Sequence, residues 1–144
     1  MRAMDLAHYI VEVAHYMKDP VSNLKLLKIM YFIHRDFSEN NKKLIEDQEF
    51  EAWTYGPVIP QVYYEFSIHV ARPIRPTWPH KSNAKEPIKG IRKRIEEYVK
   101  KLPWELVKES HRCDGAWKKV YREYSREKIS HELIMEEKGL VHGE

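Results

Sequence analysis

Cysteine, glycine and long apolar runs are all scarce in this sequence of 144 residues. The one cysteine, Cys113, excludes an intramolecular disulfide and a cysteine-rich zinc site, which agrees with a reducing compartment. The longest uninterrupted apolar run, residues 29–33, is far shorter than the roughly 18 to 20 residues that a membrane span needs. Asp5, His8 and Glu12 interrupt the N-terminal apolar pattern, unlike the apolar block of a secretory signal. We therefore expect a cytoplasmic protein without a membrane partner.

The signatures of several enzyme classes are also missing from the sequence. The five glycines form neither a Walker phosphate loop nor a dinucleotide-binding motif. The eight histidines do not cluster, and an exposed strand face explains the acidic residues of 46–51 without Mg²⁺. We therefore expect no catalytic residues, no metal and no cofactor. One alternative is an enzyme using His111 and Cys113, because a cysteine at a helix N-terminus has a lowered pKa, although the sequence identifies no oxyanion hole.

Apolar residues at three- and four-residue spacing predict a mainly helical chain. A helix over 4–17 is followed by a central one that begins after the N-cap Ser22 and ends at Asn40. Alternation over 46–53 predicts a strand, and Tyr55-Gly56-Pro57 a turn. The next helix holds Pro57 or Pro60 in its first turn. Further helices are expected over 88–102, from Pro103, from Asp114-Gly115 and over 130–139, and an irregular loop over 72–87. The predicted fold class is mainly α with a small β element, a compact single-domain helical bundle of about six helices over residues 1–144.

Positive charge is concentrated in residues 72–101, which we call the basic segment. It holds ten Lys and Arg against three Glu, whereas the whole chain has a net charge of only +3. Such a segment suits an acidic partner, so its residues Lys89, Arg92, Lys93 and Arg94 are candidates for partner binding. Two alternatives remain open: a solvated helix face, and a nucleic-acid-binding regulator that contacts phosphates through the same residues.

Four stretches of the sequence carry a family resemblance: residues 23–32, 50–63, 110–117 and 129–134. The second includes Glu-Ala-Trp-x-Tyr-Gly-Pro-Val-x-Pro-x-Val-Tyr over 51–63. Together they resemble the Panacea domain, a family that includes SocA-like antitoxins and many prophage-encoded proteins. The resemblance covers about residues 4–137, and the basic segment falls in the variable middle of the family. Leu27 stands where the family usually has Gln, and Ala116 stands where it has Pro.

The resemblance implies a protein that neutralises a toxin encoded nearby, by direct binding or as an adaptor that delivers the toxin to a protease. The expected partners are therefore a cognate protein toxin and, in the adaptor alternative, a protease. Enzymatic activity is not implied. The candidate partner-binding residues in the matching motifs are Trp53, Tyr55, Gly56, Pro57, Tyr64, His111 and Trp117. The alternative for most of them is a scaffold role, in which the large rings anchor the core and Gly56 and Pro57 shape the turn.

Overall fold

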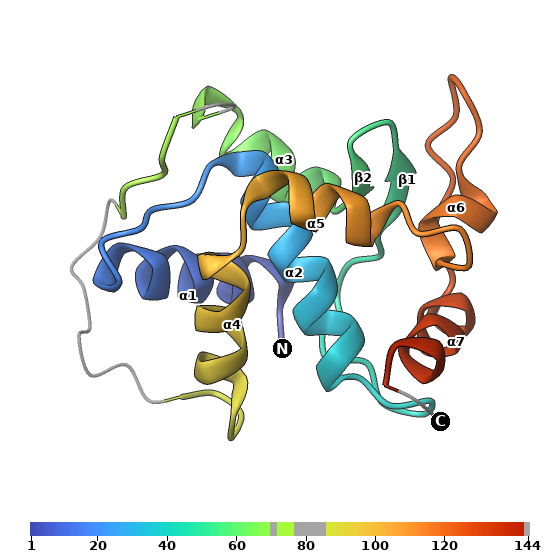
Figure 1. Ribbon diagram of the computed structural model, residues 1–144, viewed down its shortest axis with the longest axis horizontal. Helices are drawn as coiled ribbons and strands as arrows, with labels where there is room; N and C mark the ends of the chain where they lie inside the picture. The colour runs from blue at the N-terminus through green and yellow to red at the C-terminus, as the bar shows by residue number, and fades with distance from the viewer. Residues whose placement is uncertain (70–71, 77–85, 143–144) are drawn as a thin grey trace.

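The computed structural model describes residues 1–69, 72–76 and 86–142. Seven α-helices and one two-stranded antiparallel sheet occur in these residues, which confirms the mainly helical fold class. In chain order the elements are α1 (Ala3–Tyr16), α2 (Asn23–Phe37), β1 (Glu51–Trp53), β2 (Gly56–Val58), α3 (Pro60–Glu65), the 3₁₀ helix η1 (Ser67–His69), α4 (Ile91–Lys100), α5 (Pro103–Ser110), α6 (Ala116–Val120) and α7 (His131–Val141) (Figure 1).

Helix α2 forms the centre of the molecule, as predicted. It packs against α1, α3, α4, α5, α7 and β2, and Figure 1 shows it running through the middle of the other elements. Ile29, Phe32 and Ile33 are completely shielded from solvent, because neighbours cover several faces of the helix. The predicted cap is confirmed, since the Ser22 hydroxyl accepts a hydrogen bond from the backbone N–H of Lys25 at 3.3 Å. The predicted end at Asn40 was wrong, and the helix ends at Phe37.

The other helix starts follow local sequence signals. Pro60 and Pro103 occupy the first turns of α3 and α5, where a missing backbone N–H removes no helical hydrogen bond. The Ser130 hydroxyl caps α7 by accepting from the N–H of Leu133 at 3.2 Å. This helix continues past Gly139, its predicted end, to Val141. The last turns are held from outside, because the Lys138 ammonium donates to the backbone carbonyl of Ser38.

The β element is a short hairpin, β1–β2, and is smaller than predicted. Residues 46–50 are not in the strand, because the N–H of Glu46 and the carboxylate of Asp47 bond to the backbone of Met1 and Ala3 at the start of the chain. Glu51 pairs with Val58 and Trp53 with Gly56. Pro57 therefore lies in β2 and not in the first turn of a helix. The outer edge of β1 is bonded to residues 127–129.

The predicted irregular loop over 72–87 is described only at its two ends. Residues 72–76, 86 and 87 contain no helix or strand, and the N–H of Ile74 bonds to the carbonyl of Val21 at 2.8 Å. The part of the loop at 77–85 lies outside the described residues. Helix α4 begins at Ile91, later than residue 88, after Gly90 with a φ of +88°. Within the described residues, the basic segment therefore consists of the irregular stretches 72–76 and 86–90 and of helix α4.

Candidate partner-binding site

Two of the motif stretches singled out in the sequence come together around the hairpin. The indole N–H of Trp117 donates to the backbone carbonyl of Trp53 at 2.6 Å. The His111 ring stacks on Trp117 with a centroid distance of 3.9 Å and an interplanar angle of 8°. Trp117 is buried, so these contacts hold the hairpin against the end of α5 and the start of α6. Residues more than fifty positions apart in sequence thus form one structural unit.

Gly56 lies where the hairpin closely approaches the end of α5. Its φ of +111° is in the region that side-chain-bearing residues rarely adopt. A Cβ atom built there would lie 3.3 Å from the Ser110 hydroxyl oxygen and 3.6 Å from Nε2 of His111. Pro57 follows in β2 and is buried. Gly56 and Pro57 therefore shape the hairpin where it meets α5, and neither exposes a side chain for a partner.

A buried lysine lies beneath the hairpin turn. Lys28, on α2, is 6% exposed, and its ammonium donates to the backbone carbonyl of Tyr55 at 2.7 Å. Within the described part of the chain it has no carboxylate partner, and burial lowers its pKa to about 8. Burial also lowers the pKa of His111, and the nearby cations Lys28 and Lys118 add to this effect. Sequence reasoning missed Lys28, although a lysine inside a strongly apolar helix pattern was a usable signal.

The outer side of the hairpin is aromatic and partly exposed. Tyr55 is 47% and Tyr64 58% exposed. Tyr63 joins them, stacking on Tyr55 and meeting Trp53 edge to face at 5.0 Å between centroids. The guanidinium of Arg126 lies 3.9 Å from the centre of the Trp53 ring. Trp53 itself is 3% exposed, so it supports this surface from beneath while Tyr55 and Tyr64 are available to a partner.

A hollow of about 550 Å³ separates the hairpin turn from the segment that follows α6. We call it the aromatic hollow; it is lined by Trp53, Thr54, Tyr55, Tyr121, Glu123, Tyr124, Ser125 and Arg126. The Thr54 and Tyr121 hydroxyls are 3.0 Å apart and join its two walls. Residues 121–126 were not among the predicted site residues, although aromatic and basic residues alternate in their sequence, Tyr-Arg-Glu-Tyr-Ser-Arg.

The candidate residues of the basic segment lie apart from the hairpin, with α4 on the other side of α2 in Figure 1. Arg94 forms an ion pair with the buried carboxylate of Asp36 at 3.0 Å. Arg92 pairs with Glu96 on its own helix at 3.3 Å. Lys89 and Lys93 are exposed and make no ion pair within the described residues. Among the four candidates, these two lysines have charges available to a partner.

The described residues lack the arrangements expected of a metal centre and of a membrane-spanning helix. They contain no group of three or more His, Cys, Asp or Glu side chains placed to hold a metal ion. None of their helices is long and apolar enough to cross a membrane. His111 is stacked on Trp117, and its Nε2 atom faces Gly56 without a hydrogen-bond partner in the described structure.

The geometry defines a mainly helical protein in which a small hairpin, clamped by His111 and Trp117, carries an exposed aromatic surface. The family model for the antitoxin SocA-like, Panacea domain matches residues 26–118, and the chain belongs to this family. It is also similar to Antitoxin SocA from Caulobacter vibrioides (strain NA1000 / CB15N), with 38% identity over 65 residues. That alignment covers 45% of this chain and 35% of the relative, so the chain spans about a third of the relative's length. No solved structure matches the chain.

Proposed function

We propose that this chain is an antitoxin that acts in the cytoplasm, neutralising a protein toxin by binding it directly and without catalysis. Membership of the SocA-like family and similarity to a protein named Antitoxin SocA support the antitoxin role. Direct binding needs a surface able to hold another protein. The aromatic surface of the hairpin supports this part of the proposal.

The exposed tyrosines of this surface are the observation that carries direct binding. Tyr55 and Tyr64 expose about half of their side chains. Tyr124, on the segment across the aromatic hollow from the hairpin turn, is 99% exposed. Tyrosine, tryptophan and arginine are enriched among the residues that supply most of the binding energy at protein interfaces. The hairpin that carries Trp53 and Tyr55 is already held in place by the contacts of Trp117 and His111. A preorganised surface loses less conformational entropy on binding than a flexible one.

The basic segment has a second, longer-range role in the proposal. Lys89 and Lys93 on one side of the molecule attract an acidic toxin surface and accelerate its encounter with the antitoxin. Arg94 has a different role, because its guanidinium balances the buried carboxylate of Asp36. Arg92 is engaged with Glu96. We therefore restrict steering to the two lysines.

The test is growth of a host that expresses the open reading frame beside the gene for this chain. That product alone should arrest growth, and co-expression of this chain should restore it. Co-purification of both proteins from the rescued culture is the expected result for direct binding. A proteolytic adaptor would instead give rescue with loss of the toxin protein, and the toxin would remain when a host protease is deleted. A neighbouring product that is harmless, or toxic but not rescued, would contradict the antitoxin role.

A matched variant makes this experiment specific to the hairpin. Tyr64→Ala removes an exposed ring of the aromatic surface, whereas Tyr16→Ala removes a partly exposed ring from α1. Rescue and co-purification should weaken for the first variant and remain for the second. Equal loss for both variants would indicate general destabilisation, which thermal unfolding of each variant measures separately.

A further inference from the structure

The aromatic hollow has features that the fold itself does not require. Its volume of about 550 Å³ falls in the range of sites that hold small molecules or a few side chains. One wall is the hairpin turn at Thr54 and Tyr55, and the other is the segment 121–126. The base of that segment is fixed, because residues 127–129 bond to β1. The hollow is therefore an opening between two anchored loops.

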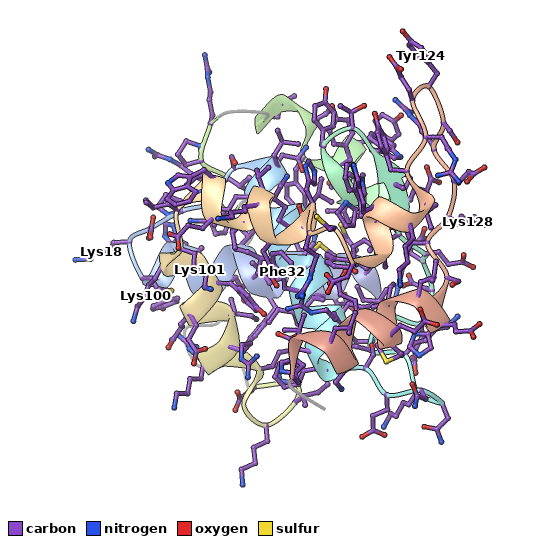
Figure 2. The ribbon with its side chains drawn as sticks, turned by 45° about the vertical axis from the view of Figure 1, so that its right-hand side comes forward. Lys18, Phe32, Lys100, Lys101, Tyr124 and Lys128 are labelled. Atoms are coloured by element: carbon purple, nitrogen blue, oxygen red, sulfur yellow. The ribbon has the colours of Figure 1, made fainter. Side chains whose placement is uncertain are left out.

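Tyr124 lies at the tip of the segment 121–126 in an unfavourable backbone conformation. Its φ of +63° is left-handed, which is unfavourable for a residue with an aromatic side chain. The side chain is 99% exposed, and Figure 2 shows it projecting away from the body of the molecule. A strained backbone that presents a fully exposed ring is the arrangement expected where a binding partner covers that ring.

Arg126 supplies a charge without a counter-ion. Its guanidinium lies over Trp53, and Nη1 donates to the Tyr64 hydroxyl at 3.4 Å. No carboxylate of the described residues pairs with it, or with the neighbouring Arg122 and Lys128. Residues 118–128 hold five Lys and Arg against two Glu. A guanidinium oriented by an aromatic face can donate two hydrogen bonds to one carboxylate, so the local charge favours an acidic partner.

The lining of the hollow favours a protein segment over a single-stranded nucleic acid. Bases need free ring faces on which to stack, along a continuous basic groove. Here Arg126 covers Trp53, Tyr55 stacks on Tyr63, and Glu123 places a negative charge in the lining. A loop carrying one apolar side chain and one carboxylate satisfies both the aromatic walls and the unpaired guanidinium.

We propose that the aromatic hollow receives an acidic loop of the toxin, with a toxin carboxylate on Arg126 and an apolar toxin side chain against Tyr55 and Tyr124. This inference rests on the proposed antitoxin function and adds to it the site and the chemistry of the segment bound. The segment is expected to lie at the centre of the interface, because Tyr, Trp and Arg side chains converge there.

The experiment measures the affinity of this chain and its variants for the purified product of the neighbouring open reading frame. Tyr124→Gly removes the ring and also relieves the left-handed backbone, so it should keep or raise Tm while weakening binding about tenfold or more. Arg126→Glu should weaken binding at least as much, and an Asp-to-Arg or Glu-to-Arg change in the bound toxin loop should restore it. The matched control is Lys18→Glu, a charge reversal on an exposed residue that Figure 2 shows far from Tyr124.

The outcomes separate this inference from the function on which it rests. If the unmodified chain binds and rescues while Tyr124→Gly and Arg126→Glu bind within about twofold of it, the hollow is not the site and the antitoxin function stands. If the unmodified chain neither binds nor rescues, both proposals fall. Variants that lose only self-association in sedimentation, or only binding to an oligonucleotide, would also overturn the inference by identifying a different occupant.

Discussion

The guanidinium of Arg35 lies 2.8 Å from the carboxylate of Glu137, and both side chains are shielded from solvent. The Tyr31 hydroxyl and the N–H of Ala116 also donate to this carboxylate, each at 2.9 Å. Arg35 in turn reaches Asp36 at 3.0 Å. One acidic side chain of α7 thus joins α2 to the start of α6, the helix that carries Trp117.

Glu137→Ala should therefore destabilise the protein strongly. The change takes one carboxylate partner from Arg35 and leaves the Tyr31 hydroxyl and the N–H of Ala116 without their acceptor. Breaking a buried ion pair typically costs about 3–5 kcal/mol of unfolding free energy. The matched control is Glu136→Ala, whose side chain is 51% exposed and pairs with Lys119 on the surface. That change should stay within about 0.5 kcal/mol. Urea denaturation of both variants measures the difference, and equal effects would contradict a structural role for the Arg35–Glu137 pair.

Two glycine substitutions should change stability in opposite directions. Gly56→Ala places a side chain at a φ of +111° and close to Ser110, so it should lower the free energy of unfolding by more than about 1 kcal/mol. Gly139→Ala lies in α7, where nothing is within 4 Å of the added Cβ, and should raise it by about 0.5–1 kcal/mol. Thermal unfolding checks both. A neutral Gly56→Ala would show that the hairpin turn tolerates another conformation.

Lys28 should make stability depend on alkaline pH. Burial lowers its pKa from 10.5 to about 8, so between these values the unfolded chain holds a proton that the folded chain has released. The contribution of Lys28 to the free energy of unfolding therefore rises with pH from about 8 toward 10.5. Lys28→Met removes this titration while leaving the other groups in place. Urea denaturation at pH 7, 8, 9 and 10 should show the free energy of unfolding of the unmodified protein rising relative to that of the variant. A difference that does not change with pH would contradict the lowered pKa of the buried Lys28.

Lys89, which precedes α4, and Lys93, which lies on it, should affect the rate of association alone. The double variant Lys89→Glu, Lys93→Glu should slow toxin association about tenfold at low salt, with little change at high salt and an unchanged Tm. Arg94→Ala should instead lower Tm, because it leaves the buried Asp36 carboxylate with less positive charge nearby. Stopped-flow association and thermal unfolding distinguish the two effects. An unchanged association rate would remove the lysines from the mechanism.

Local signals in the sequence were sufficient for most of the helices. Ser22 and Ser130 cap helices through hydroxyls that bond three residues ahead, so their roles follow from nearest neighbours. The strand was overextended because Asp47 is bonded to Ala3, a contact 44 positions away that alternation cannot reveal. Gly139 was misread as a stop because the contacts that hold the end of α7 come from α2 and the residue after it.

The candidate site was predictable only in part, for the same physical reason. Trp53, His111 and Trp117 were identified from their motifs, and the structure joins them. The charge pattern of the basic segment could not show that Arg94 is paired with Asp36, 58 positions earlier. Tyr124 and Arg126 were missed because their significance depends on facing the hairpin across a hollow. Burial and pairing at a distance decide which side chains are available to a partner.

The pairing around β1 limits how any partner can be recognised. One edge of β1 is paired with β2, the other is bonded to residues 127–129, and β2 is buried against α2 and α5. In the part of the chain that the structure describes, this hairpin therefore has no open edge to which a foreign strand could be added. The partner binding proposed for the hairpin therefore depends on side-chain contacts and not on added strand pairing. Partner preference can then shift through single substitutions at the rim, while the backbone beneath stays unaltered.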